Sequence, residues 1–298
     1  DALPIYERFN LPLEMIARIK HHLRYEYSES VTLDPHILYL HPRKSALLSV
    51  QEFNLQIDPA PVQISKNLDP EGNIQNILFF KEPTSYLSIE VQATVETTEF
   101  NPFDFVYFPF ESKTLPITYS NSYQKTLSPY LGLEGVTPTV EQMARQIASG
   151  VRYSTSAYLS ALNEFIFSNF AYEIREEGAP NSPEFTLINR KGSCRDYAVL
   201  FSALCRAMGL ATRFVSGYYI GVAPVDVPNQ THHLHAWVEV YLPGGGWRGY
   251  DPTQHEVVSG NHIPLAASCL PEEITPVFGS YRGAATSLLS TNVFIERI

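Results

Sequence analysis

The sequence predicts an α+β protein in which an N-terminal antiparallel β-sandwich precedes a second, α+β domain with a cysteine-bearing helix packed on an antiparallel sheet. Three observations predict this architecture. Short segments of alternating apolar and polar residues fill roughly residues 15–105, whereas amphipathic helical patterns appear only after residue 133. A strand pattern and a hairpin pattern follow the helix that begins near Cys194. The low charged fraction of 17%, with 22 prolines and 16 glycines, favours strands and turns over long surface helices.

The composition limits the classes of protein to which the chain can belong. Its 298 residues, 44% of them hydrophobic, suffice for one large domain or two ordinary ones with a sizeable core. The formal net charge of −10, without a cluster of Lys and Arg, argues against a nucleic-acid partner. Apolar runs stay well short of about 20 residues, so we expect neither a transmembrane helix nor a membrane partner.

The N-terminus and the cysteines bear on the cellular compartment. The segment after Asp1 lacks the basic and apolar layout of a secretory signal, although a leader removed from a precursor would leave the same start. The three cysteines, Cys194, Cys205 and Cys269, are too few and odd in number for a disulfide framework. We therefore expect a reducing, cytoplasmic setting in which one thiol is available for function.

The first domain is expected over residues 1–105. Asp1–Asn10 is expected as an irregular arm, and Leu11–Leu23 as either a short helix or the beginning of a strand. Alternation then predicts several strands, most cleanly over Tyr86–Phe100, with a turn at Asp69–Asn73. Short strands separated by turns of this kind are typical of an antiparallel sandwich.

The second domain is expected over residues 134–298, after an ordered connection over residues 106–133 that is rich in Pro, Tyr and Phe. It opens with a helix that Thr137 or Thr139 caps and Gly150 stops. A second amphipathic helix follows, and a loop then leads to the cysteine-bearing helix.

Cys194 lies at the start of that third helical pattern. Apolar residues recur after it at helical spacing, and Gly209 marks the C-terminal end. In a first turn, unpaired N–H groups and the positive end of the helix macrodipole favour thiolate over thiol. The N–H of Cys194 itself would face an oxyanion formed at an attacked carbonyl. The competing interpretation is a small buried core residue, which we apply to Cys205 and Cys269.

A histidine and an aspartate lie on the hairpin pattern that follows. His235 and Trp237 share one face of a predicted strand, the glycines after Pro243 form the turn, and the returning strand ends at Asp251. If Asp251 lies opposite Trp237, its carboxylate shares the face of His235. A slip of one residue would send it to the other face, so we predict the Trp237–Asp251 pairing or an equivalent bulge.

These three residue types suit nucleophilic acyl transfer. A neighbouring imidazole ionises a thiol and later protonates the leaving amine, and a carboxylate on the other ring nitrogen orients the imidazole. A satisfied structural role is the alternative for a histidine on a strand. Zinc binding is a second alternative, but the cysteine and histidine spacings of structural zinc sites are absent, so we expect no metal or other cofactor. The histidines imagined around zinc with Cys194 are His232, His233, His235, His255 and His262.

Three blocks of sequence resemble the transglutaminase-like superfamily. They are GSCRDYA around Cys194, the following LCRAMGLATRFVSGYY, and HAWVEVYLPGGGWRGYDPT from His235. The β-rich N-terminal region resembles the domain that often precedes such cores in bacteria, and the tail from His262 resembles the closing segment. The resemblance implies a papain-like fold and assigns the nucleophile, base and orienting acid to Cys194, His235 and Asp251.

The resemblance also suggests a role for Tyr172, within a Phe-Ala-Tyr motif. Tyr172 either lines the site and assists the oxyanion or is an ordinary core aromatic residue. The chain departs from many bacterial relatives after the cysteine, where Arg195–Val199 replaces Gln-Asp-Phe-Ala-His, and at Ser268-Cys269, where Gly-Arg is common. We expect these departures to alter substrate contacts.

The favoured hypothesis is a cysteine hydrolase, a protease or amidase, that forms a thioester with a peptide or side-chain amide of a peptide or protein substrate. The second hypothesis is a transglutaminase that passes the same acyl group to an amine. The third is a catalytically silent binding or scaffold protein on the same fold.

Overall fold

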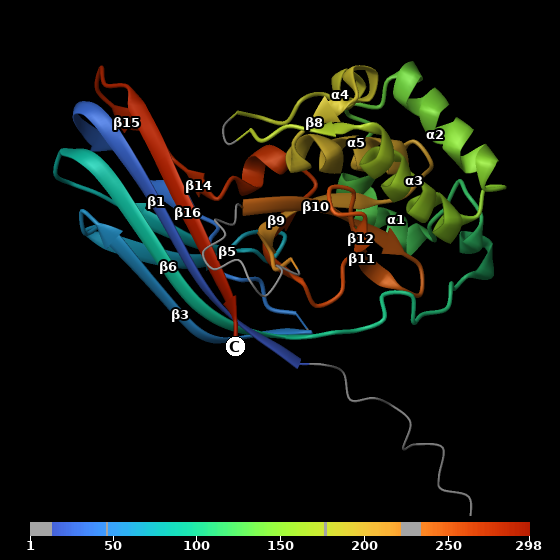
Figure 1. Ribbon diagram of the computed structural model, residues 1–298, viewed down its shortest axis with the longest axis horizontal. Coiled ribbons are helices and arrows are strands. Elements are labelled where there is room, and N and C mark those ends of the chain that lie inside the picture. The colour runs from blue at the N-terminus through green and yellow to red at the C-terminus, as the bar shows by residue number, and fades with distance from the viewer. Residues whose placement is uncertain (1–13, 46, 176–177, 222–233) are drawn as a thin grey trace, which may run out of the picture.

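The computed structural model describes residues 14–298 except 46, 176–177 and 222–233 (Figure 1). The predicted arm Asp1–Asn10 lies outside the described residues. Of the two alternatives for Leu11–Leu23, the described part is strand, because β1 begins at Glu14. Its residues alternate in burial, with Ala17 and Ile19 inside the protein and Arg18 outside, which is the period of a strand.

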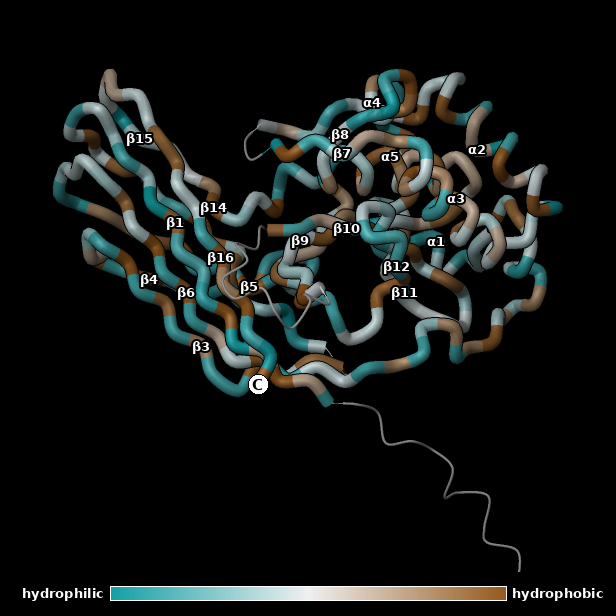
Figure 2. The backbone as a smooth tube through the Cα atoms, in the orientation of Figure 1, coloured by the Kyte–Doolittle hydropathy of each residue, from teal (hydrophilic) through white to brown (hydrophobic). Residues whose placement is uncertain are grey.

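A five-stranded antiparallel sheet, here called the N-terminal sheet, forms one layer of a β-sandwich. Its central strand is β1, which pairs on one side with β6 and on the other with β16. Near its end, β1 also pairs with β15. The strands are β1 (Glu14–Leu33), β3 (Leu48–Asp58), β6 (Thr84–Thr98), β15 (Tyr281–Arg282) and β16 (Ser287–Arg297). Figure 2 shows hydrophilic and hydrophobic residues alternating along these strands.

A four-stranded antiparallel sheet forms the second layer, in the order β14-β2-β5-β4. Its strands are β2 (His36–Leu38), β4 (Gln63–Leu68), β5 (Ile74–Phe79) and β14 (Val277–Phe278). Leu38 and Leu78 of this layer share one buried cluster with Ile19, Leu87 and Ile89 of the N-terminal sheet. The predicted sandwich is therefore confirmed.

The helices gather in the second half of the molecule (Figure 1). The expected connection contains a short helix that its sequence pattern did not predict, α1. The cap of α2 is Thr137, whose hydroxyl accepts from the Val140 N–H. The helices are η2 (Phe110–Lys113), α1 (Asn121–Leu127), η3 (Ser128–Leu131), α2 (Pro138–Gly150), α3 (Thr155–Asn169), α4 (Pro183–Asn189), α5 (Cys194–Arg206) and η4 (Pro271–Ile274).

The central helix α5 packs on a second five-stranded antiparallel sheet, here called the C-terminal sheet, in the order β12-β11-β10-β9-β13. Its strands are β9 (Thr212–Tyr219), β10 (Leu234–Leu242), β11 (Gly246–Asp251), β12 (Glu256–Val257) and β13 (His262–Ser268). A short parallel pair, β7 (Ala171–Tyr172) and β8 (Lys191–Gly192), precedes α5. The expected helix on an antiparallel sheet is present.

The two halves share a hydrophobic core. Tyr218 and Ile263 of the C-terminal sheet lie in the same buried cluster as Ile19 and Leu23 of β1. The side-chain amide of Asn73, from the predicted turn, donates to the Ala267 carbonyl and accepts from the Ala267 N–H, each at 2.9 Å. A single fully buried asparagine thus pairs both backbone groups of one residue in β13.

The last strand departs from the expected domain organisation. We placed residues 134–298 together in the second domain, but β16 pairs with β1 along its whole length, from Ala17↔Arg297 to Tyr27↔Ser287. The alternating pattern of this segment predicts a strand but does not say which sheet it joins. The boundaries at residues 105 and 134 stay a prediction. In the part of the chain that the structure describes, no helix has the length and apolar character needed to cross a bilayer.

Candidate active site

The nucleophile candidate, Cys194, is the first residue of α5, as predicted. Ser193 is the N-cap residue and forms a capping box with Asp196, whose carboxylate accepts from the Ser193 N–H at 2.7 Å. The Ser193 hydroxyl also donates to this carboxylate, at 2.9 Å. Gly192 leaves room for this carboxylate, since a Cβ at that position would lie 2.8 Å from Cβ of Asp196. The N–H of Cys194 has no acceptor within its own helix.

Asp196 also ties the start of α5 to the segment that overhangs it. Its second carboxylate oxygen accepts from Nη2 of Arg175 and from the Asn181 N–H, both at 2.6 Å. The carboxylate is almost fully buried, so these charge-assisted bonds lie in a low-dielectric surrounding. Asp196 therefore fixes the start of α5, and with it Cys194, both to the N-cap residue and to the segment that contains Arg175 and Asn181.

His235 lies near the beginning of β10, directly opposite Gly217 of β9. Glycine at position 217 lets the Trp237 ring approach the backbone of β9, because a Cβ there would lie 2.6 Å from that ring. On the other side, the hairpin register pairs Val238 with Tyr250. Continued by one residue, that register places Trp237 opposite Asp251, which is the pairing predicted from the sequence.

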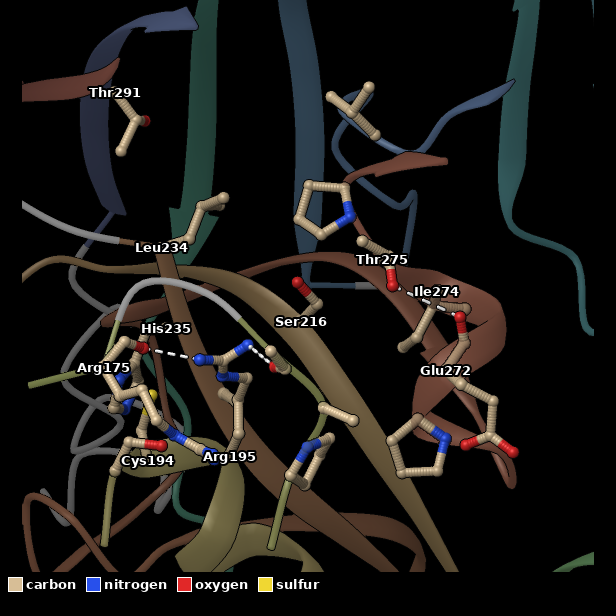
Figure 3. Close-up of a pocket in the computed structure, with 18 of the residues that line it drawn as sticks. Arg175, Cys194, Arg195, Ser216, Leu234, His235, Glu272, Ile274, Thr275 and Thr291 are labelled. Atoms are coloured by element: carbon tan, nitrogen blue, oxygen red, sulfur yellow. Dashed lines mark hydrogen bonds between the residues drawn. The ribbon is translucent and has the colours of Figure 1, made fainter. Parts of the chain in front are cut away.

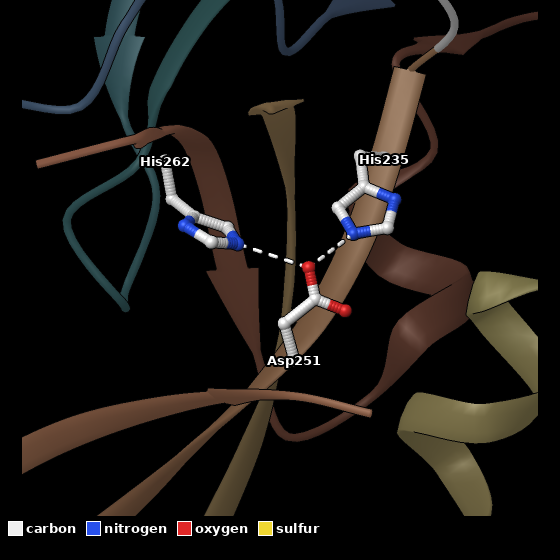
Figure 4. A group of neighbouring side chains, drawn as sticks. All are labelled: His235, Asp251 and His262. Atoms are coloured by element: carbon white, nitrogen blue, oxygen red, sulfur yellow. Dashed lines mark hydrogen bonds and ion pairs between the residues drawn. The ribbon is translucent and has the colours of Figure 1, made fainter. Parts of the chain in front are cut away.

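The consequence of this register is a short hydrogen bond between the two side chains. Nε2 of His235 donates to Oδ2 of Asp251 at 2.6 Å, and both residues are buried (Figure 4). The other carboxylate oxygen, Oδ1, accepts from the N–H groups of Thr253 and Gln254 at 2.9 and 3.3 Å. Since Nε2 is engaged, Nδ1 of His235 is the nitrogen left to interact with the Cys194 thiol, which lies beside it.

A second histidine completes this cluster, and sequence reasoning considered it only as a metal ligand. Nε2 of His262, at the start of β13, donates to the same Oδ2 of Asp251 at 2.9 Å (Figure 4). Strands β10 and β9 separate β11 from β13 in the sheet order, so only the curl of the sheet brings these side chains together. No spacing in the sequence signals that contact.

The electrostatics of the site favour an ion pair. Burial works against a charged imidazole, but the Asp251 carboxylate and the Cys194 sulfur outweigh it and raise the pKa of His235 to about 10. Burial likewise opposes the thiolate, but His235 and the Ala236 N–H lower the pKa of Cys194 below its ordinary value. Although burial would raise it, His235 and His262 hold the pKa of the Asp251 carboxyl well below its usual range. Both shifts therefore favour a thiolate–imidazolium pair over a neutral thiol and imidazole.

A cavity of about 610 Å³ opens in front of the thiol (Figure 3). Of the two alternatives for Tyr172, the structure favours the first: the side chain lines the cavity from β7, and its hydroxyl neighbours Cys194. Burial and the negative sulfur raise the pKa of Tyr172, so the phenol stays protonated and can donate a hydrogen bond. Arg195, within the segment expected to alter substrate contacts, also lines the cavity.

The cluster of His235, Asp251 and His262 also has the spacing of metal ligands, because its ligand atoms lie within 4.8 Å of one another. Here the carboxylate oxygen accepts from both imidazoles, which satisfies that oxygen without a cation. The larger zinc set imagined from the sequence is not brought together among the described residues. His255 pairs with Glu164 at 2.9 Å, and the imagined ligands His232 and His233 lie outside the described residues.

The other two cysteines occupy different surroundings. Cys205 is fully buried in the core of the second half, where burial raises its pKa well above the ordinary value. Cys269 is partly exposed, and burial together with the neighbouring Glu71 raises its pKa as well. Only Cys194 among the three has the surroundings of an activated thiol.

Known proteins resemble this chain in both halves. Residues 141–252 match the transglutaminase-like superfamily, and residues 17–96 match the bacterial transglutaminase-like N-terminal region. An uncharacterised Mycobacterium tuberculosis protein is 26% identical over 296 residues, which cover 93% of this chain and 91% of that protein. A protein-glutamine gamma-glutamyltransferase from Pseudomonas aeruginosa is 30% identical over 121 residues, which cover 39% of this chain and 18% of that protein.

A solved structure shares the whole fold. A Cytophaga hutchinsonii protein described as a candidate cysteine protease superposes with a TM-score of 0.71 at 20% identity. The superposition covers 96% of this chain and 91% of that one, so both halves and their arrangement are common to the two proteins.

Proposed function

Because the chain belongs to the transglutaminase-like superfamily, we propose that it is a cysteine hydrolase that cleaves a peptide or side-chain amide through Cys194, His235 and Asp251. One observation carries the proposal. Cys194, His235 and Asp251 contact one another in series at the edge of a cavity. The pKa of the thiol is lowered, the pKa of the imidazole is raised, and the buried carboxylate lies 2.6 Å from the imidazole.

In the first half of the reaction, the Cys194 thiolate attacks the amide carbon and a carbon–sulfur bond forms. The Cys194 N–H and the Tyr172 hydroxyl are the donors available to the resulting oxyanion. When the tetrahedral intermediate collapses, the carbon–nitrogen bond breaks and Nδ1 of His235 gives its proton to the leaving amine. The product of this half is a thioester, and His235 becomes neutral.

In the second half, neutral His235 takes a proton from water as the water oxygen attacks the thioester carbon. The carbon–sulfur bond then breaks, and a carboxylic acid and the thiolate–imidazolium pair result. Asp251 keeps its charge throughout and holds the imidazole through Nε2. His262 acts on neither reacting atom; it positions Asp251.

An amine acceptor in place of water gives the second candidate function, a protein-glutamine transglutaminase. The similarity of part of the chain to the Pseudomonas aeruginosa gamma-glutamyltransferase supports this candidate. The fold shared with the candidate protease from Cytophaga hutchinsonii does not distinguish the two acceptors, because both reactions pass through the same thioester. Water is the simpler acceptor and the one we favour.

The proposal is tested by incubating the chain with a mixed peptide library that contains glutamine, with and without a fluorescent primary amine. We expect mass spectrometry to find hydrolysed amides with the wild type and Cys269→Ala, and none with Cys194→Ala. Incorporation of the amine would replace the hydrolase with the transglutaminase. If the wild type and Cys194→Ala both leave the library unchanged, the silent scaffold is correct.

A further inference from the structure

The cavity beside Cys194 has two walls, and the N-terminal sheet supplies one of them. Leu23 of β1 and Ser287, Leu289 and Thr291 of β16 line the cavity together with Cys194. The pairs Leu23↔Thr291 and Tyr25↔Leu289 are two residues apart in the register of the two strands. Residues two apart point to the same face, so one face of this strand pair looks into the cavity.

The opposite side of the cavity continues the apolar surface. Leu234 lies one residue before His235, and Ile274 and Val277 come from η4 and β14. In Figure 3, Leu234 and His235 lie close together on one strand, and Ile274 lies across the cavity. The cavity therefore offers an apolar volume next to the reacting atoms, and its size is within the roughly 300–1,000 Å³ of ligand pockets.

The charged side chains that line the cavity are engaged elsewhere or lie at its rim. Arg175 pairs with Asp196, and the Arg195 guanidinium donates to the carbonyls of Gly178 and Arg175 at 2.6 and 2.5 Å. Glu272 is exposed and lies on the side of the cavity away from Cys194 (Figure 3). Burying a charged substrate group among the remaining apolar residues would cost free energy without a partner.

We propose that the substrate carries a large apolar or aromatic side chain next to the attacked amide, and that the strand pair β1–β16 binds this side chain through Leu289. The proposal rests on the proposed function, since it takes Cys194 as the nucleophile. It gives the N-terminal sheet a direct part in substrate selection. The strand that carries Leu289 comes from the end of the chain, so both ends of the sequence build the substrate site.

Retention of peptides by the 298-residue chain carrying Cys194→Ala tests this proposal apart from catalysis. The chain is mixed with the peptide library, retained peptides are separated by ultrafiltration, and their sequences are read by mass spectrometry. We expect large apolar residues to be enriched about tenfold or more over acidic ones among retained peptides, a fold-change typical of burying one such side chain. Adding Leu289→Asp should abolish this enrichment.

Leu288→Asp is the matched control on the same strand. The Leu288 side chain is 67% exposed and points to the other face of the sheet, so its substitution should leave the enrichment intact. Leu289→Thr, which keeps a strand-forming residue while shortening the apolar side chain, guards against misfolding and should weaken the enrichment. Circular dichroism and the unfolding temperature verify that each variant folds.

The outcomes separate the two proposals. Retention without apolar enrichment, no retention at all, or equal loss with Leu288→Asp and Leu289→Asp would overturn the substrate proposal. Apolar-selective retention that depends on Leu289, in a protein whose wild type hydrolyses nothing and transfers nothing, would sustain the apolar binding site and overturn the proposed function.

Discussion

The residue that decides the chemistry of the site is His235. Its ring contacts a negative carboxylate through one nitrogen and a thiol through the other, so a proton on the ring is stabilised from both sides. The two titrations are coupled, so protons leave the Cys194–His235 pair in macroscopic steps. The active form, thiolate with imidazolium, exists between the lowered pKa of Cys194 and the raised pKa of His235.

The first prediction concerns the pH dependence of this pair. Below the pKa of an ordinary thiol, about 8.5, alkylation slows about tenfold for each pH unit, because only the thiolate reacts. Because its pKa is lowered, we expect alkylation of Cys194 by iodoacetamide to slow less than this between pH 8 and pH 6. Hydrolysis should fall on the acid side as Cys194 gains a proton and on the alkaline side as His235 loses its own near pH 10.

Peptide mass spectrometry measures the alkylation of Cys194 and of Cys269 in the same sample. Cys269 is the internal control, because its raised pKa should make its reaction fall steeply below pH 8. His235→Asn should give Cys194 the same steep dependence. If Cys194 and Cys269 slow in parallel in the wild type, the ion pair does not form.

At the scale of elements, a β-hairpin and a separate strand both contribute to the position of the Asp251 carboxylate. The hairpin β10–β11 brings Asp251 to His235 through local register alone. Strand β13 brings His262 to the same oxygen from across the sheet. Asp251 is thereby fixed at Oδ2 by two imidazoles and at Oδ1 by two backbone N–H groups, which leaves its carboxylate one orientation.

The second prediction follows from the place of His262 in this arrangement. His262→Ala removes one hydrogen-bond donor from Asp251. It should lower kcat about tenfold or more, as commonly happens when a residue that orients a site carboxylate is lost. KM should change little, because His262 does not line the cavity. His262→Gln retains a side-chain donor and should recover much of the lost kcat.

Steady-state kinetics on a peptide from the library screen give both constants. His255→Ala is the matched control, since His255 pairs with Glu164 on the surface and should leave kcat unchanged. Full kcat in His262→Ala, or an equal loss in the alanine and glutamine variants, would show that His262 does not position Asp251.

At the scale of the whole molecule, a buried histidine lies where the two halves meet. Nδ1 of His21, on β1, contacts the Tyr218 hydroxyl of the C-terminal sheet at 3.0 Å, and Nε2 contacts the Thr291 hydroxyl of β16 at 3.1 Å. Burial, and then the nearby His22, lower the pKa of His21 to about 3. The native protein therefore holds this imidazole neutral at a pH where the unfolded chain protonates it.

The third prediction is the sign of the resulting pH dependence. Between the unfolded pKa of 6.5 and the native pKa of about 3, the unfolded chain binds a proton that the native chain does not. Stability should therefore fall as pH drops below 6.5, by about 1.4 kcal/mol per pH unit from this one group. His21→Gln should lose that part of the slope, whatever its stability at pH 7.

Urea denaturation at several pH values between 7 and 4.5 measures the slope for the wild type and His21→Gln. His255→Gln, at an exposed position, should keep the wild-type slope. Equal slopes for the wild type and His21→Gln would mean that His21 can take up a proton without disturbing the join between the halves.

The sequence by itself determined the features that depend on neighbours along the chain. Helical spacing of the apolar residues between Cys194 and Gly209 predicted that Cys194 begins a helix, and α5 begins there. The hairpin pattern placed His235 and Asp251 on neighbouring strands, and the Trp237–Asp251 register was predicted because a slip of one residue would send Asp251 to the face away from His235. Alternation predicted the sandwich, because each strand must bury one face.

Only the tertiary structure decided the contacts between residues far apart in the chain. His262 reaches Asp251 through the curl of a sheet, β16 crosses back to β1, and Leu289 thereby lines the cavity of a cysteine that lies in the other half. A segment's own pattern specifies which face is buried but not which partner buries it. That choice depends on how whole sheets pack, and it decided which residues surround the thiol.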